Sequence, residues 1–346
     1  MMIALALTSG CNKKTTVKTQ SPVEQESYTV RFTGYKITVK IKATAAELEK
    51  YLLDMKPLER TTKTYKLKMI GAKTTLSKPG DTVDLKMDIA GLSIPGKALL
   101  VKYQPGSEIW VILCGKFGGT GIIRFNLKEV SDGVKLTMKF EFGETEALFG
   151  AVNLQDSFQQ TIMNLVETTI AKGQANFDKS VSAEQLLEKG IRGESYETFY
   201  NGHRANIWIN ASTAAVDKAL KNPGLWDDLN KKGIADMGQC VILARPEPCP
   251  IRLKIVGFDF DINSFHVIYK PGELISAYWV SDLVIAHCQF LFKPERNGTR
   301  FSFVNVLEVP QAMSPEGTNI LMNMANFPGY MEKVLIEIKN NVEGIG

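Results

Sequence analysis

The chain of 346 residues contains one internal repeat, and this repeat limits its fold more than any other feature of the sequence. Residues 41–52 align without gaps to 209–220, and residues 101–106 match 267–272 around a shared Pro-Gly. The offsets between matched positions are 168 and 166 residues, so they hardly drift along the chain. Matches that keep their order at a nearly constant offset predict two copies of one structural unit.

The two copies have the same order of predicted elements. A strand at 36–43, or 204–211 in the second copy, leads into a short helix capped by Thr44 or Ser212. A series of strands with alternating apolar and polar residues follows, separated by turns at Pro-Gly, Asp-Gly or Asn-Gly. A long helix closes each copy. This pattern predicts an α+β fold with an antiparallel sheet in each half.

This element order resembles the START-like superfamily, also called SRPBCC or the helix-grip fold, which includes polyketide cyclases. The resemblance implies two tandem helix-grip domains, each a curved antiparallel sheet wrapped around a long C-terminal helix. We place them at residues 28–178 and 196–346, with a linker at 179–195. The resemblance rests on element order, because the superfamily has no diagnostic motif. It further implies a cavity for a hydrophobic ligand such as a lipid, sterol or polyketide.

The first residues resemble the end of a bacterial lipoprotein signal. A short apolar run within residues 1–10 ends in Leu7-Thr-Ser-Gly before Cys11, whose thiol would accept a diacylglyceryl group. Residues 11–27 then form a polar tether. The run is short and has no preceding Lys or Arg, so the alternative is a frayed N-terminus with an incidental cysteine. We expect a lipidated Cys11 and a membrane-anchored lipoprotein on the periplasmic or extracellular face.

Composition and cysteine spacing exclude several other classes. The net charge of +4 is too small to indicate a nucleic-acid partner. No pair of cysteines has the C-x-x-C spacing of a metal site, and we predict neither a metal nor a cofactor. Cys240 and Cys249 flank a proline-containing segment, so a disulfide that closes a hairpin and a pair of buried free thiols are the two alternatives.

The predicted ligand-binding residues lie on the inward strand faces and the closing helices. Asn305 is the polar exception among them: an inward amide there would bind a ligand headgroup, whereas a β-bulge would turn it to solvent. A helix-grip domain without a cavity would show the same apolar pattern, so each residue either lines a pocket or fills a core. The residues are Tyr103, Phe125, Phe140, Phe158, Ile162, Tyr269, Phe290, Phe303, Asn305, Met322 and Met324.

No residue emerges as a catalytic acid, base or nucleophile. Strand parity places His266 and His287 on the faces opposite to the inward aromatic residues, and His203 stands at a strand start, so we expect each histidine at the rim or in solvent. Three hypotheses follow. The protein binds or carries a hydrophobic small molecule; it is a cyclase- or hydrolase-like enzyme of the same superfamily; or it is a structural lipoprotein with filled cavities. We favour the first.

Overall fold

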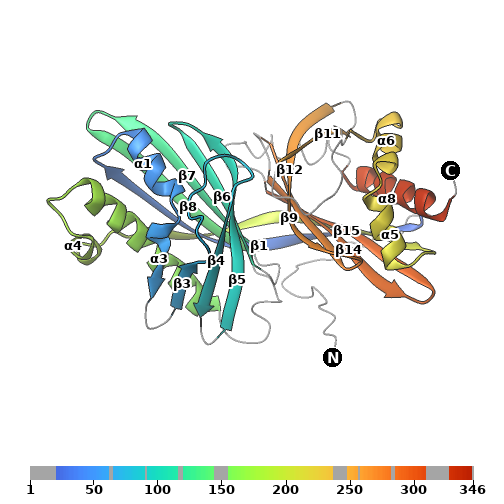
Figure 1. The fold of residues 1–346 in the computed structure, drawn as a ribbon, viewed down its shortest axis with the longest axis horizontal. Helices are drawn as coiled ribbons and strands as arrows, with labels where there is room; N and C mark the ends of the chain where they lie inside the picture. Colours follow the sequence, from blue (N-terminus) through green and yellow to red (C-terminus); the bar gives the residue numbers. More distant parts are fainter. Residues whose placement is uncertain are drawn as a thin grey trace. The chain divides into compact units, whose positions relative to one another are not determined.

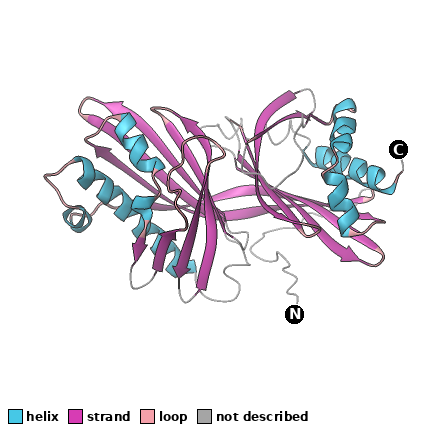
Figure 2. Ribbon diagram, in the orientation of Figure 1, coloured by secondary structure: helices cyan, strands magenta, loops and turns pink. Residues whose placement is uncertain are grey.

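The computed structural model describes residues 21–61, 65–89, 92–115, 120–143, 155–236, 248–255, 258–281, 285–308 and 327–344. Strands account for more of these residues than helices do (Figures 1 and 2). The chain divides into two compact units. The first unit contains residues 31–199, and the second contains residues 200–346 together with the beginning of the first strand, up to Val30.

The elements of the first repeat begin with a long strand and end with a long helix. They are β1 (Val23–Ile41), α1 (Ala45–Leu53), the 3-10 turn η1 (Lys56–Leu58), β2 (Arg60–Thr61), β3 (Tyr65–Met69), β4 (Thr82–Ile89), β5 (Leu92–Gln104), β6 (Glu108–Gly115), β7 (Thr120–Val130), β8 (Gly133–Gly143) and α3 (Gln155–Phe177). The short helix α4 (Ala183–Glu188) follows, within the segment predicted as a linker.

The second repeat follows the same order, with helix α6 where the first repeat has η1 and with one strand fewer among the described residues. Its elements are β9 (Glu194–Ile209), α5 (Thr213–Leu220), α6 (Pro223–Lys231), β10 (Ala235–Asp236), β11 (Cys249–Ile255), β12 (Phe258–Lys270), β13 (Leu274–Val280), β14 (Ile285–Glu295), β15 (Gly298–Glu308) and α8 (Phe327–Glu343). Among the described residues, no helix is both long and apolar enough to cross a membrane.

The prediction of two separate helix-grip domains, each a sheet wrapped around its own long helix, is wrong. The described strands form one antiparallel sheet of 15 strands, in the order β10-β11-β12-β13-β14-β15-β9-β1-β8-β7-β6-β5-β4-β3-β2. The first strands of the two repeats, β1 and β9, are neighbours at its centre. The sheet therefore runs through both repeats instead of closing within each one.

The length of β1 and β9 is the physical reason for this difference. The sequence predicts these strands from Lys36 and Arg204, but they begin at Val23 and Glu194. The additional residues carry backbone N–H and C=O groups that need partners, and a neighbouring strand supplies them. β1 also begins inside the segment predicted as a polar tether.

A tyrosine packs over a glycine at equivalent places in the two repeats. A Cβ atom on Gly34 would lie 2.3 Å from the ring of Tyr196, and a Cβ atom on Gly202 would lie 2.3 Å from the ring of Tyr28. The spacing from tyrosine to glycine along the chain is the same in both repeats, Tyr28 to Gly34 and Tyr196 to Gly202. Only glycine leaves room for a ring at this distance from the backbone.

In each unit the helices cover one face of the strands and form a core with it. In the first unit, Leu48 of α1 and Val166 and Ile170 of α3 belong to one buried cluster with residues of β1 and β3–β8. In the second unit, Leu220 of α5 and Leu335 of α8 belong to a cluster with β9 and β11–β15. Figure 1 shows α5, α6 and α8 gathered together in the second unit.

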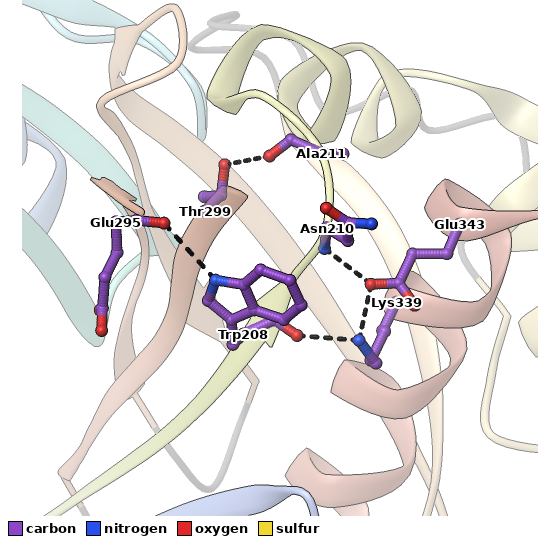
Figure 3. Close-up of polar contacts among 7 residues, drawn as sticks. All are labelled: Trp208, Asn210, Ala211, Glu295, Thr299, Lys339 and Glu343. Carbon is purple, nitrogen blue, oxygen red and sulfur yellow. Dashed lines mark hydrogen bonds and ion pairs between the residues drawn. The ribbon is translucent and has the colours of Figure 1, made fainter. Parts of the chain in front are cut away.

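The last helix of each repeat is tied to the first strand of that repeat by side-chain bonds to the backbone. In the second unit, Lys339 Nζ donates to the Trp208 carbonyl at 3.0 Å and to Glu343 at 2.6 Å, and Glu343 accepts from the Asn210 N–H at 2.7 Å (Figure 3). In the first unit, Gln174 Nε2 donates to the Lys40 carbonyl at 2.9 Å. Gln174 and Lys40 are the counterparts of Lys339 and Trp208 at the repeat offsets.

Candidate functional site

A row of polar side chains crosses the helix-covered face of the second unit's sheet. The directly paired residues of five successive strands are His266, Ala277, Cys288, Asn305 and His203. Directly paired residues of antiparallel strands point to the same face. Ala277 and Cys288 belong to the core cluster under the helices, so the whole row faces that core. We call these five residues the polar row.

His266 is buried in this row, and the expectation that it lies at the rim is wrong. Its side chain is 7% exposed. The register between β12 and β13 shifts between His266 and Ile268, where β12 carries one additional residue. Such a bulge reverses the alternation of side chains beyond it. Parity counted back from Tyr269 therefore assigns His266 to the wrong face.

Burial keeps the groups of the polar row uncharged at neutral pH. It lowers the pKa of His266 to about 4, and it raises the pKa of the Cys288 thiol. The Asn305 Nδ2 group donates to Cys288 Sγ at 2.9 Å. No hydrogen bond from a described residue reaches the His266 ring. A protonated thiol is a poor nucleophile, so this arrangement favours binding over covalent chemistry.

Ser264 extends the polar row toward the next register position. It lies two residues before His266 on β12 and pairs directly with Trp279, a member of the core cluster. Its side chain is 0% exposed, and among the described residues its Oγ atom has no hydrogen-bond partner. A buried hydroxyl without a partner costs stability, which makes Ser264 a candidate for contact with a ligand.

The other end of the polar row is held by hydrogen bonds. The His203 ring contacts Ser27 Oγ at 2.8 Å and Gln25 Oε1 at 3.3 Å, both from β1. Gln25 Nε2 in turn donates to Glu332 of α8 at 3.1 Å. Burial lowers the pKa of His203. The start of β1 therefore joins this end of the row to the closing helix.

The first unit has the same row in the same register, but its side chains are apolar. The paired residues are Leu100, Val111, Ile123, Phe140 and Tyr35. All five are at most 3% exposed, and Leu100 and Phe140 replace His266 and Asn305 at the repeat offsets.

Tyr35, the counterpart of His203, is the one hydroxyl in this apolar row, and it has two partners. It donates to Glu167 of α3 and accepts from the Gly193 N–H at 2.6 Å. Burial raises its pKa to about 12. Among the described residues of the first unit, the Tyr35 hydroxyl in this row therefore has hydrogen-bond partners.

A small cavity in the first unit lies under α1 and α3. Its lining includes Tyr51, Leu52, Val111, Phe125 and Thr169, and its volume is about 10 Å³. That is room for about one water molecule, whereas ligand pockets begin at roughly 300 Å³. This cavity does not hold a drug-sized or lipid-sized ligand.

The structure brings some of the predicted binding residues together and separates others. Phe290 and Phe303 stack at 4.8 Å in the second core, next to Asn305, which is 2% exposed and inward. Tyr269 instead lies at the end of its strand, where it donates to Asp217 at 2.9 Å and accepts from Lys221 at 2.5 Å.

The predicted residues of the first unit are core residues or strand-end residues where they are described. Phe125 and Phe140 are buried in its core, and Tyr103 donates to Glu49 of α1 at 3.2 Å. Phe158 and Ile162 belong to α3, but their side chains lie outside the described residues, as do Met322 and Met324 entirely. The assignment of these residues to a ligand stays a prediction.

The cysteines predicted to have special roles are described only in part. Cys249, at the start of β11, is disulfide-bonded. Cys240, its predicted partner, lies outside the described residues, so the pairing stays a prediction. Cys11 also lies outside them. Cys114 and Cys288 are free and buried.

Sequence reasoning missed the polar row except for Asn305. Comparing the two repeats position by position would have revealed it, since His266 and Cys288 stand where the first repeat has Leu100 and Ile123. His287 lies on the opposite face, as its parity predicts, and it is half-buried. It contacts Ser276 Oγ at 2.8 Å and stacks on Tyr278, and burial lowers its pKa to about 4.

Comparison with known proteins gives similar structures but no family. No family model matches the chain, and no curated protein matches it. Similar solved structures include the di-domain ARO/CYC BexL from the BE-7585A biosynthetic pathway. BexL is 10% identical to this chain, the match covers 90% of this chain and 98% of BexL, and the TM-score is 0.34. The di-domain ARO/CYC StfQ from the steffimycin pathway has 11% identity, the same coverage and a TM-score of 0.34.

A shorter similar structure, TTHA0849 from Thermus thermophilus, has 16% identity, covers 41% of this chain and 97% of its own, and has a TM-score of 0.33. The similar structures thus include two-domain aromatase/cyclase proteins. At these scores we assign neither a family nor an activity from them.

Proposed function

We propose that this protein binds a hydrophobic small molecule and that the second unit holds it beside the polar row. The observation that carries this proposal is the contrast between the two rows, which occupy the same register on the same face of equivalent strands. One row is apolar except for the Tyr35 hydroxyl, and the other contains two imidazoles, a thiol and an amide.

The first unit supports the proposal because it shows what this fold needs at these positions. Leu100, Val111, Ile123 and Phe140 fill its row and pack under α1 and α3 without a polar group. A polar row is therefore not required for the strands and helices to pack. Each buried polar group without full hydrogen bonding costs about 1–3 kcal/mol, so the second unit retains them at a cost to its stability.

We further propose that Cys11 is lipidated and holds the protein at the periplasmic or extracellular face of a membrane. The small residues before Cys11 support this, and so does the polar segment that separates it from β1 at Val23. An anchored binding protein would exchange an apolar ligand with the bilayer. Intact mass of the protein expressed from its full gene tests the anchor, and an unmodified chain that stays in the aqueous phase would overturn it.

Titration with Nile red, an uncharged apolar dye, tests the binding function on the full chain. The variant His266→Leu/Asn305→Leu makes two positions of the polar row apolar without large changes in volume. We expect saturable fluorescence enhancement with the wild type and a loss of affinity of about tenfold or more in the variant, since both polar contacts are removed.

The matched control is Phe140→Leu, which changes the row of the first unit and should leave dye affinity unchanged. Thermal unfolding verifies that each variant is folded. Absence of saturable binding by the wild type, or equal affinity in all three proteins, would overturn the proposal and leave a structural or interaction role.

A further inference from the structure

We propose that Ser264 and His266 form the headgroup contact of this site, and that the site selects uncharged ligands with a hydroxyl or carbonyl group over anionic ones. This inference rests on the proposed function and specifies the chemical class of the ligand. It concerns the end of the polar row on β12, where the buried Ser264 Oγ atom has no hydrogen-bond partner among the described residues and the buried His266 lies two residues away.

The geometry places the two groups together on the core-facing side of β12. Ser264 and His266 are two residues apart on one strand, before the bulge, so their side chains point to the same face. Their cross-strand partners, Trp279 and Ala277, both belong to the core cluster. Between His266 and Cys288 in the row, Ala277 contributes only a methyl group.

The hydrogen-bonding capacity of the pair suits a neutral oxygen. The Ser264 hydroxyl is both a donor and an acceptor, and the neutral imidazole of His266 offers one of each. A ligand hydroxyl or carbonyl would satisfy the orphaned Oγ atom of Ser264, which is 0% exposed and has no partner in the described structure.

An anionic headgroup would lack a countercharge at this position. Burial is the cause of the lowered pKa of His266 that the described residues account for. Lys221, which directly follows helix α5, is paired with Asp217 at 2.8 Å. Burying a carboxylate without a partner costs far more than burying a hydroxyl.

Isothermal titration calorimetry of the full chain with decan-1-ol and with decanoate at neutral pH separates the two classes. The ligands have the same chain length and differ only in the charge and oxidation state of the headgroup. We expect decan-1-ol to bind about tenfold or more tightly than decanoate.

Two serine variants test the assignment to Ser264. Ser264→Ala removes the orphaned hydroxyl; we expect decan-1-ol affinity to fall about three- to tenfold, while thermal stability stays equal or rises. The control is Ser276→Ala on the opposite face, where Oγ contacts His287 Nε2 at 2.8 Å. This variant should lose stability and keep its affinity. If Ser264 served only to stabilise the fold, Ser264→Ala would lower the thermal stability and would not weaken decan-1-ol binding.

The outcomes distinguish the inference from the proposed function. If neither ligand binds, the proposed function fails and the inference fails with it. If decanoate binds as tightly as decan-1-ol, or if Ser264→Ala binds like the wild type, a hydrophobic-ligand protein remains but the headgroup contact and its selectivity are wrong.

Discussion

The two units have the same framework but differ in the row that crosses their cores. In both, the last helix is bonded to the first strand, through Gln174 and Lys40 in one and Lys339 and Trp208 in the other. In both, an acidic residue of the first helix accepts from a strand-end tyrosine, as Glu49 does from Tyr103. These shared contacts hold helices onto strands.

The difference between the two rows distinguishes polar side chains that stabilise the fold from polar side chains that the fold does not need. Groups that occur in both units have partners and fix one element to another. Of the groups that occur only in the second unit, Asn305 and Cys288 bond to each other, whereas Ser264 Oγ has no partner among the described residues. Polar groups that the framework does not need are the best candidates for a binding role.

The largest effect should come from moving a polar residue into the apolar row. Phe140→Asn removes a large side chain that is 2% exposed and leaves an amide among Leu100, Ile123 and other apolar residues. We expect a loss of about 4 kcal/mol in the free energy of unfolding, measured with urea. The converse change, Asn305→Leu, should lie within about 1 kcal/mol of the wild type. Equal losses of unfolding free energy in Phe140→Asn and Asn305→Leu would contradict this difference between the two rows.

The second prediction concerns pH, since all three histidines belong to the second unit. Burial lowers the pKa of His266 from 6.5 to about 4 in the folded state. Between these values the unfolded chain binds more protons, so stability is complete above pH 6.5 and falls as the pH drops toward 4. Each such histidine accounts for a loss of up to about 3 kcal/mol.

His287 has the same shift, so both histidines titrate in this window. Urea unfolding between about pH 7 and pH 4.5 should therefore show a smaller loss of stability in His266→Leu than in the wild type, because the contribution of one histidine is removed. Identical pH dependence in the two proteins would show that His266 is not buried in the folded state.

The smallest effect should come from the bonds shared by both units. Lys339→Ala removes donors to the Trp208 carbonyl and to Glu343 and should cost about 1 kcal/mol, because the lysine is partly exposed. Gln174→Ala removes one bond to the Lys40 carbonyl and should cost about half as much. Chemical denaturation of each variant measures both values, and neither change should alter Nile red binding.

Local sequence signals predicted the elements well because they act within a few residues. Thr44 caps α1 and Ser212 caps α5, as predicted, and Thr44 also forms a capping box with Glu47. The predicted turns at Gly80, Gly106 and Gly133 have positive φ values, which glycine adopts without strain. Asn305 was also identified as a polar residue on an apolar face.

The sequence by itself determined the repeat, the order of its strands and helices, and their caps and turns, because each depends on residues close in the chain. Only the tertiary structure decided that β1 and β9 are neighbours in one sheet, since strand partners depend on backbone groups far apart in sequence. It also decided which face His266 occupies: a single additional residue after His266 changes the face of that side chain, and only the pairing of β12 with β13 reveals it.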